Sequence, residues 1–77
     1  PIRIILRSSL RGKIKFFNEN KNFGFISTKK MRDDLYFNGV NYPKDLIPHK
    51  SHKVEFRVVE TSRGKAAEDI HVLRYDE

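Results

Sequence analysis

Residues 13–18 and 23–27 read Lys-Ile-Lys-Phe-Phe-Asn and Phe-Gly-Phe-Ile-Ser, and this stretch decides the fold class. Both runs are rich in aromatic and β-branched residues, which are enriched in strands. The four residues between them, Glu-Asn-Lys-Asn at 19–22, are polar and have turn chemistry. The stretch therefore predicts two strands joined by a turn.

Three further strands are predicted, and alternation of apolar and charged residues is clearest in the second of them. Val54, Phe56 and Val58 alternate with Glu55 and Arg57, a period of two that is typical of a half-buried strand. The three strands are expected at residues 35–38, 53–60 and 70–72.

The longest connection, residues 39–51, contains Pro43 and Pro48, and neither proline fits a central strand. We expect it to hold a single helical turn around residues 44–47. Charged loops and turns separate the other strands. Short strands in this arrangement predict one small, closed, all-β barrel.

The chain's 77 residues make one domain, and a domain this small buries only about 60% of the surface of its unfolded chain. There is no cysteine, so disulfides and a cysteine-based zinc site are excluded. The same absence fits a reducing compartment, and we expect a cytoplasmic location. No apolar run approaches the roughly 20 residues of a membrane span.

The net charge of +6 is distributed unevenly along the chain. Residues 1–30 carry eight basic side chains and one acidic one, a net of +7, whereas residues 31–77 carry eight basic and nine acidic ones, a net of −1. Such asymmetry points to a polyanionic partner, nucleic acid first and an anionic membrane surface second. A basic surface that serves only solubility is the alternative.

Residues 1–10 precede the predicted domain at 11–77 and contain arginine but no acid. Three interpretations of this extension stay open: the remnant of a targeting segment, an extra edge strand, or an ordered tail. It lacks an apolar stretch long enough for a secretory signal.

Six Phe and three Tyr are a high aromatic content for this length, and five of these rings lie between residues 16 and 36. Stacking on such rings contributes roughly 1–3 kcal/mol per base, and the lysines among them neutralise phosphates. The alternative is that the rings form the hydrophobic core.

Strand alternation bears on this choice. Phe23 and Phe25 share one face of their strand, and Tyr36 shares a face with Asn38. Because an Asn side chain prefers water, we expect Tyr36 to point outward and its two chain neighbours inward. If the two strands pair, Phe23 and Phe25 join Tyr36 on one exposed aromatic surface, and such a surface usually marks a binding site.

These motifs resemble the cold-shock domain. Residues 12–18, Gly-Lys-Ile-Lys-Phe-Phe-Asn, and 21–26, Lys-Asn-Phe-Gly-Phe-Ile, are similar to its Gly-Lys-Val-Lys-Trp-Phe-Asn and Lys-Gly-Phe-Gly-Phe-Ile, the latter being its first ribonucleoprotein motif. Residues 34–38, Asp-Leu-Tyr-Phe-Asn, look like the second motif, Asp-Val-Phe-Val-His. Residues 54–56 and 63–70 are similar to the family's fourth and fifth strands, so the resemblance covers residues 11–73.

The resemblance implies an all-β, five-stranded antiparallel Greek-key barrel of the oligonucleotide-binding fold, with an N-terminal extension. It also implies that outward rings on the first three strands stack the bases of single-stranded RNA or DNA, RNA ahead of DNA, in an RNA-chaperone or gene-regulatory role. By the same resemblance, the aromatic rings would stack bases, and Lys15 and Lys21 would contact the nucleic-acid backbone. Asn18 would contact a base edge or hold the turn, and Arg63 would lie at the rim. The implied nucleic-acid-binding residues are Lys15, Phe16, Phe17, Asn18, Lys21, Phe23, Phe25, Tyr36 and Arg63.

Some positions depart from the family's pattern. Phe16 replaces the usual Trp, a larger ring with an indole donor, and Asn22 replaces a turn Gly, although Asn tolerates the left-handed conformation. Asn38 and Gly39 stand where the family has His and Phe, and Tyr42 is the candidate for its loop aromatic residue. Two stacking rings are therefore missing at one end, and we predict weaker binding or a shorter footprint than a complete set of rings gives.

No other residue pattern in the sequence supports a metal site or a catalytic site. The spacing His49-x-x-His52 suits two metal ligands, but no third ligand is evident, and exposed loop histidines are expected instead. Asp33-Asp34 mimics paired carboxylates, yet adjacent acids at a strand start usually end a turn. We therefore expect no enzyme activity, no catalytic residue, no metal, no cofactor and no small-molecule substrate. The expected partner is single-stranded RNA or DNA, bound by a monomer without membrane contact.

A second hypothesis is a protein-interaction module, in which a barrel of this fold has weak or lost nucleic-acid binding and docks a protein partner, as part of a larger nucleic-acid-processing protein. The missing rings at Asn38 and Gly39 and the apolar residues at 2–6 motivate it.

Overall fold

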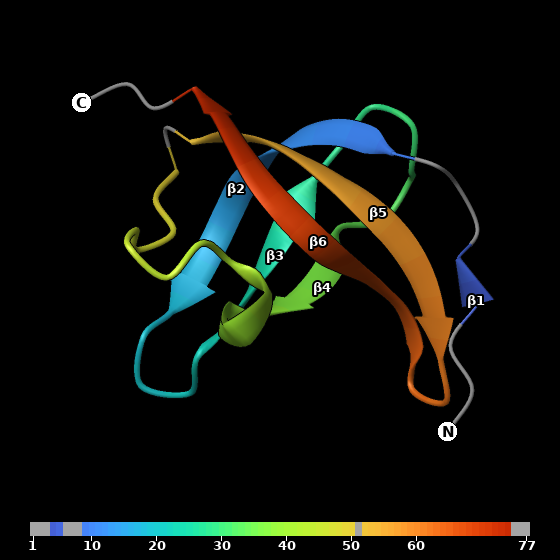
Figure 1. Ribbon diagram of the computed structural model, residues 1–77. Helices are drawn as coiled ribbons and strands as arrows, with labels where there is room; N and C mark the ends of the chain where they lie inside the picture. The colour runs from blue at the N-terminus through green and yellow to red at the C-terminus, as the bar shows by residue number, and fades with distance from the viewer. Residues whose placement is uncertain (1–3, 6–8, 51, 75–77) are drawn as a thin grey trace.

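The computed structural model describes residues 4–5, 9–50 and 52–74 (Figure 1). No helix in these stretches is long and apolar enough to cross a membrane. The elements in chain order are β1 (Ile4–Ile5), β2 (Leu10–Asn18), β3 (Phe23–Ser27), β4 (Leu35–Asn38), the short 3₁₀ helix η1 (Gly39–Asn41), β5 (Lys53–Thr61) and β6 (Gly64–Arg74).

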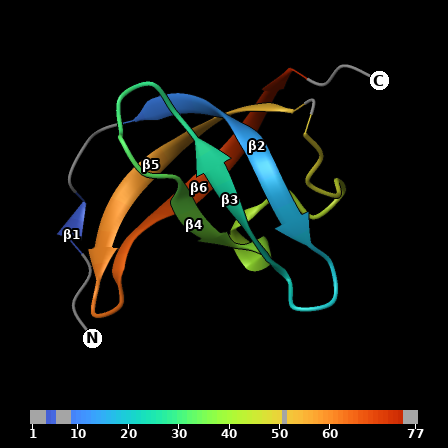
Figure 2. The same cartoon turned by 180° about the vertical axis from the view of Figure 1, so that it is seen from behind.

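Five of the strands close a barrel in the order β2-β3-β4-β6-β5, with β5 returning to β2. Every barrel pairing is antiparallel except β4 with β6, where Tyr36 lies beside Ala66 and Phe37 beside Ala67 on parallel strands. The predicted all-β, five-stranded barrel of the oligonucleotide-binding type is confirmed, with one parallel pairing in place of antiparallel pairing throughout. Figure 2 turns the barrel so that β2, β3 and β4 face the viewer.

The long, curved strand β5 pairs with two strands along one of its edges. Its first half pairs with β2, and its second half pairs with β1, where Ile4 lies opposite Glu60 and Ile5 opposite Val59. Residues 1–10 were open to three interpretations, and the extra edge strand is the one that the structure shows for Ile4 and Ile5. Residues 1–3 and 6–8 lie outside the described part of the chain.

The core consists of inward-facing residues from all five barrel strands. Val54, Phe56 and Val58 have at most 1% of their surface exposed, as the alternation in this segment predicts. Complete burial of a side chain of this size stabilises the fold by about 1.5–3 kcal/mol. The other buried members of the cluster are Ile14, Ile26, Leu35, Phe37, Tyr42, Ala67 and Ile70.

Two elements differ from the sequence prediction. β6 begins at Gly64 instead of residue 70, because pairing with both β4 and β5 holds a polar stretch in the strand. Asp69 has a φ of 55° and interrupts the alternation there. The helical turn lies at Gly39–Asn41 rather than around residues 44–47, where Leu46 N donates to Pro43 O at 3.2 Å in a simple turn.

Candidate nucleic-acid interface

Four aromatic rings lie together on the outer face of β2, β3 and β4, and we call Phe16, Phe23, Phe25 and Tyr36 the aromatic platform. Register places Phe25 between Phe16 on one side and Tyr36 on the other. The ring centroids of neighbouring members are 5.9–6.4 Å apart, with Phe23 stacked on Tyr36 at 5.9 Å. Phe16 is 44% exposed and Tyr36 39% exposed, so the rings present a continuous surface to solvent.

The rings point outward because their chain neighbours fill the barrel. Gly24 and Ile26 are buried on the opposite face of β3, and Leu35 and Phe37 are buried on the opposite face of β4. The predicted outward orientation of Tyr36, with its two chain neighbours inward, is confirmed. Antiparallel pairing of β3 with β4 brings the two Phe rings beside it, as the sequence predicts.

A β-bulge in β2 shapes the edge of the platform. The register shifts between Ile14 and Phe16, which makes Lys15 the extra residue of β2 at this point. Lys15 and Phe16 are therefore both exposed, although they are adjacent in a strand. The Lys15 ammonium lies 3.1 Å from a carboxylate oxygen of Asp34, beside the platform.

Phe17 does not lie with the other rings. It faces the barrel interior, where its ring stacks on that of Phe37 with centroids 5.9 Å apart and planes 14° apart. It is one of the half-buried residues packed against the core. The structure therefore separates Phe17 from the four rings with which the sequence grouped it.

This separation predicts different consequences for two adjacent substitutions. Phe17→Ala removes a core contact and is expected to lower the free energy of unfolding by about 2 kcal/mol. Phe16→Ala removes an exposed ring and is expected to lower it by less than about 1 kcal/mol. Urea denaturation of the two variants beside the wild type measures both values. Equal losses would contradict the assignment of the two rings to opposite faces.

The remaining predicted site residues lie around the platform rather than in it. Asn18 ends β2, and its side-chain oxygen accepts a hydrogen bond from Lys21 N at 3.1 Å, so Asn18 holds the turn. Lys21 is exposed in that turn. Arg63 is exposed in the β5–β6 turn, three residues before Ala66, which pairs with Tyr36.

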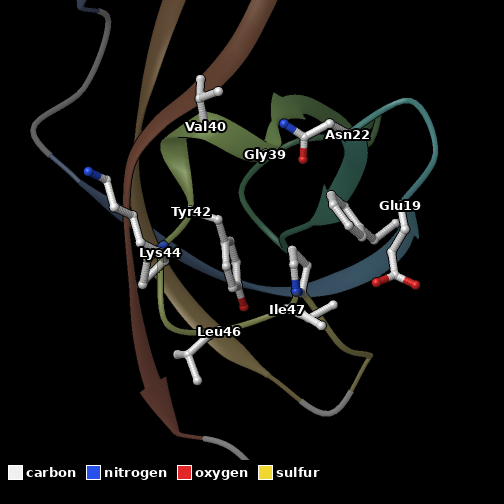
Figure 3. Close-up of a pocket in the computed structure, with 11 residues that line it drawn as sticks. Glu19, Asn22, Gly39, Val40, Tyr42, Lys44, Leu46 and Ile47 are labelled. Atoms are coloured by element: carbon white, nitrogen blue, oxygen red, sulfur yellow. The ribbon is translucent and has the colours of Figure 1, made fainter.

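The end of the platform where the family's His and Phe are missing has its own local structure. Asn38 Oδ1 accepts a hydrogen bond from Val40 N at 3.0 Å and caps η1. Asn22 has a φ of 58°, so the predicted left-handed turn residue is confirmed. Its side chain lies directly over Gly39, where a Cβ would be 2.6 Å from Asn22 Cγ (Figure 3). Asn22 thus occupies the space into which a side chain at position 39 would project.

A hollow of about 380 Å³ lies beside this end of the platform, and we call it the apolar hollow (Figure 3). Val40 is 76% exposed and Ile47 64% exposed at its rim. This hollow could not be predicted from the sequence, because most of the residues that form it come from a connection without periodicity. The residues that line it include Phe17, Val40, Tyr42, Leu46, Ile47 and Pro48.

Tyr42 and His52 form a buried polar pair beneath the hollow. The Tyr42 hydroxyl and His52 Nδ1 are hydrogen-bonded at 2.6 Å, and the two rings stack with centroids 6.0 Å apart. Tyr42 also packs on Phe37, so it belongs to the core, and it does not supply the loop ring considered from the sequence. The expectation of exposed histidines is wrong for His52, which is 7% exposed. No group of three or more potential ligands for a metal occurs among the described residues.

Burial affects the titration of both groups. It raises the pKa of the Tyr42 hydroxyl above its ordinary value. Burial, together with the nearby His49 imidazole, lowers the pKa of His52 below 6.5. The folded protein therefore holds His52 neutral at a pH where an unfolded chain would protonate it.

This shift predicts that acid destabilises the barrel through His52. The contribution of neutral His52 to the free energy of unfolding is fully present above about pH 6.5. It is lost as the pH falls toward the lowered pKa, by at most about 1.4 kcal/mol per pH unit. Urea denaturation at pH 7.5 and pH 5 gives the free energy of unfolding of the wild type and of His52→Gln. This free energy should depend less on pH in His52→Gln than in the wild type. His71→Gln removes an exposed imidazole and serves as the control. Equal pH dependence in the wild type and His52→Gln would contradict the prediction.

Comparison with known proteins matches residues 10–73 to the "Cold-shock" DNA-binding domain. The cold shock-like protein of Aquifex aeolicus is 34% identical over 67 residues, which cover 84% of this chain and 96% of the relative. The cold shock-like protein CspE of Escherichia coli is 28% identical over 68 residues, 86% of this chain and 99% of the relative. Cold shock protein CspA of Staphylococcus saprophyticus is 34% identical over 61 residues, 78% of this chain and 92% of the relative.

A closed five-stranded barrel with aromatic rings on its outer face belongs to the oligonucleotide-binding class of small β-barrels. Within that class, the match over residues 10–73 establishes that this chain belongs to the cold-shock domain family. Proteins of this family generally bind nucleic acid. The resemblance stated from the sequence motifs is confirmed.

Proposed function

We propose that this chain binds single-stranded nucleic acid, RNA ahead of DNA, by stacking bases on the aromatic platform. The observation that carries the proposal is the set of four outward rings that runs unbroken across β2, β3 and β4. Exposed rings accept bases of any sequence because every base has a π-face. In the cell, such binding serves an RNA-chaperone or gene-regulatory role.

Basic side chains near the platform support the same proposal. Lys15 lies at its edge and Lys21 in the adjoining turn, both exposed and able to reach phosphates. The Lys15–Asp34 ion pair is exposed, so little free energy opposes its exchange for a phosphate. Three further contacts stay predictions: base stacking by Phe17, a base contact by Asn18 and a rim contact by Arg63. A base could reach Phe17 only from the side of the apolar hollow.

The apolar hollow favours a second candidate function, a protein-interaction module. Val40 and Ile47 are the two most exposed large apolar side chains of the described residues. An apolar surface of this kind is typical of contacts with another protein. In this alternative, a partner covers the hollow and nucleic-acid binding is weak or absent.

A fluorescence titration with a short labelled pyrimidine oligonucleotide, repeated at increasing salt, tests the proposal. We expect saturable binding weaker than micromolar, because two rings are missing at Asn38 and Gly39. The logarithm of the binding constant should fall with the logarithm of the salt concentration, with a slope of about −0.7 for each phosphate contact. Micromolar or tighter binding would contradict the predicted weakness, and absence of binding at low salt would favour the protein-interaction module.

A further inference from the structure

A second hollow, of about 940 Å³, lies at the opposite end of β2 from the apolar hollow. Its lining comes from the first half of β2, the β3–β4 loop and the start of β5. Figure 2 shows these three backbone segments in the upper part of the barrel. Five cationic side chains line it, and we call them the basic trough. They are Arg11, Lys13, Lys29, Lys30 and Lys53.

The trough carries an excess of positive charge, with five cations against one carboxylate, that of Glu55, which lies opposite Arg11 across the β2–β5 pairing. Lys13 lies directly opposite Lys53 across the β2–β5 pairing. Like charges in this position are destabilising. Glu55 is the one acidic residue of the lining, and it accepts a hydrogen bond from Ser9 Oγ at 3.3 Å. Within the described residues, none of the five cations forms an ion pair, whereas Lys15 and Arg57 do.

The β3–β4 loop is fastened to β2 by a buried side chain, which sets the position of two of these cations. Thr28 Oγ1 donates a hydrogen bond to Arg11 O at 2.7 Å and accepts one from Lys30 N at 3.4 Å. Met31 N also donates to Thr28 O at 3.3 Å and closes the turn. Lys29 and Lys30 are thus held beside the first half of β2 rather than left on a free loop.

The trough continues the outer face that carries the aromatic platform. Ser27 pairs with Lys13, and two residues earlier on β3 Phe25 pairs with Phe16. Two residues of a strand span about 7 Å, so the platform ends where the trough begins. The exposed side chain of Lys15 lies on β2 between Lys13 and Phe16. A strand that leaves the rings in this direction meets Lys15 first and the five cations next.

We propose that the basic trough binds the phosphates of the nucleic-acid strand beyond the aromatic platform and so lengthens the interface. The proposal rests on the proposed function, because the platform supplies the strand that the trough extends. A phosphodiester backbone matches a row of five cations that lies beside stacking rings and has a single acidic neighbour, Glu55. The missing rings remove base-stacking contacts at the Asn38 end of the platform, and the trough adds phosphate contacts at the other end.

Oligonucleotide length separates the trough from the platform. Lys29→Gln with Lys30→Gln removes two exposed trough cations, and Lys50→Gln with Lys65→Gln removes two exposed lysines elsewhere, so the two variants have the same net charge. Each is titrated with oligothymidylates of about four and about ten nucleotides, because binding sites on barrels of this class span that range. We expect the trough variant to bind the longer strand about tenfold more weakly than the control, with a salt slope smaller by about 1.4, and to bind the shorter strand as the control does.

A nuclear magnetic resonance titration of the wild type gives an independent readout. The amide signals of Lys13, Ser27 and Thr28 should shift with the longer oligonucleotide and not with the shorter one. Equal affinity of the two double variants for the longer strand would overturn the trough and leave the platform intact. Equal weakening for both lengths would also overturn it, because that result describes a general charge effect. If the wild type binds neither strand at low salt, the proposed function itself fails and the trough fails with it.

Discussion

Replacement of Phe23 and Phe25 together with alanine is expected to weaken oligonucleotide binding at least about 30-fold, while the barrel stays folded. Each base stacked on an aromatic ring contributes roughly 1–3 kcal/mol, so the loss of two rings removes at least about 2 kcal/mol of binding free energy. The two rings lie at the centre of the platform, and each contacts the other as well as Phe16 and Tyr36. No other pair of substitutions interrupts the platform as completely.

Stability is the main competing explanation, because both rings are half-buried. Phe23→Leu with Phe25→Leu keeps most of the apolar volume and removes only the rings, so it should bind weakly and unfold near the wild-type urea concentration. Val40→Ala with Ile47→Ala removes apolar surface from the hollow and should keep binding unchanged. Should the leucine variant bind as the wild type does, the rings do not stack bases. If the hollow variant alone loses binding, the interface lies in the apolar hollow.

The fold was predictable where one face of a strand is apolar and the other polar. In β5, Val54, Phe56 and Val58 alternate inward, and the sequence therefore gives both the strand and its buried face. Alternation alone missed most of β6, which only the family resemblance covered at residues 63–70, because Lys65 and Glu68 stand in its first half and Asp69 shifts the alternation. That part of the strand is held by backbone pairing with β4 and β5, and pairing between distant segments leaves no periodic signal in the sequence.

The candidate site was predictable to the level of strand faces. Asn38, which prefers water and shares a face with Tyr36, indicated the outward face of β4, and pairing then brings Phe23 and Phe25 to the same side. Alternation places Phe16 and Phe17 on opposite faces, but it does not say which of the two points outward, because the bulge at Lys15 reverses the order expected from buried Ile14. The family resemblance grouped Phe17 with the other rings, and the bulge is what turns Phe17 to the inner face.

The bulge at Lys15 and the contents of the long connection could not be predicted. The bulge is a shift of register between two strands, which no single strand encodes. Tyr42 and His52 come from a connection with two prolines, and their burial depends on where that connection crosses the barrel. The basic trough was visible only as an excess of charge in residues 1–30, because pairing alone places Lys53 beside Lys13.

Gly24→Ala is expected to destabilise the barrel strongly although it adds only one methyl group, and it tests why β3 reads Phe-Gly-Phe. A Cβ at position 24 would clash with the backbone carbonyl oxygen of Phe16 and lie 2.8–2.9 Å from two ring carbons of Phe37. Neither group can move freely, since Phe16 O is main chain and Phe37 is completely buried. Overpacking of this kind costs about 3 kcal/mol, against about 4–12 kcal/mol for the whole stability of a chain of this length.

Gly39→Ala provides the matched control for this prediction. A Cβ there would meet only the side chain of Asn22, which is exposed and can rotate away. Without a clash, Gly→Ala stabilises by about 0.4–1 kcal/mol through the unfolded chain, so the control should stay within about 1 kcal/mol of the wild type. Urea denaturation of the two variants should therefore give clearly different midpoints. If Gly24→Ala unfolds at the same midpoint as Gly39→Ala, the barrel wall between Phe16 and Phe37 has room for a methyl group. The platform rings would then be less firmly positioned, since it is the close approach of β3 to β2 and Phe37 at Gly24 that fixes Phe23 and Phe25 on the outer face.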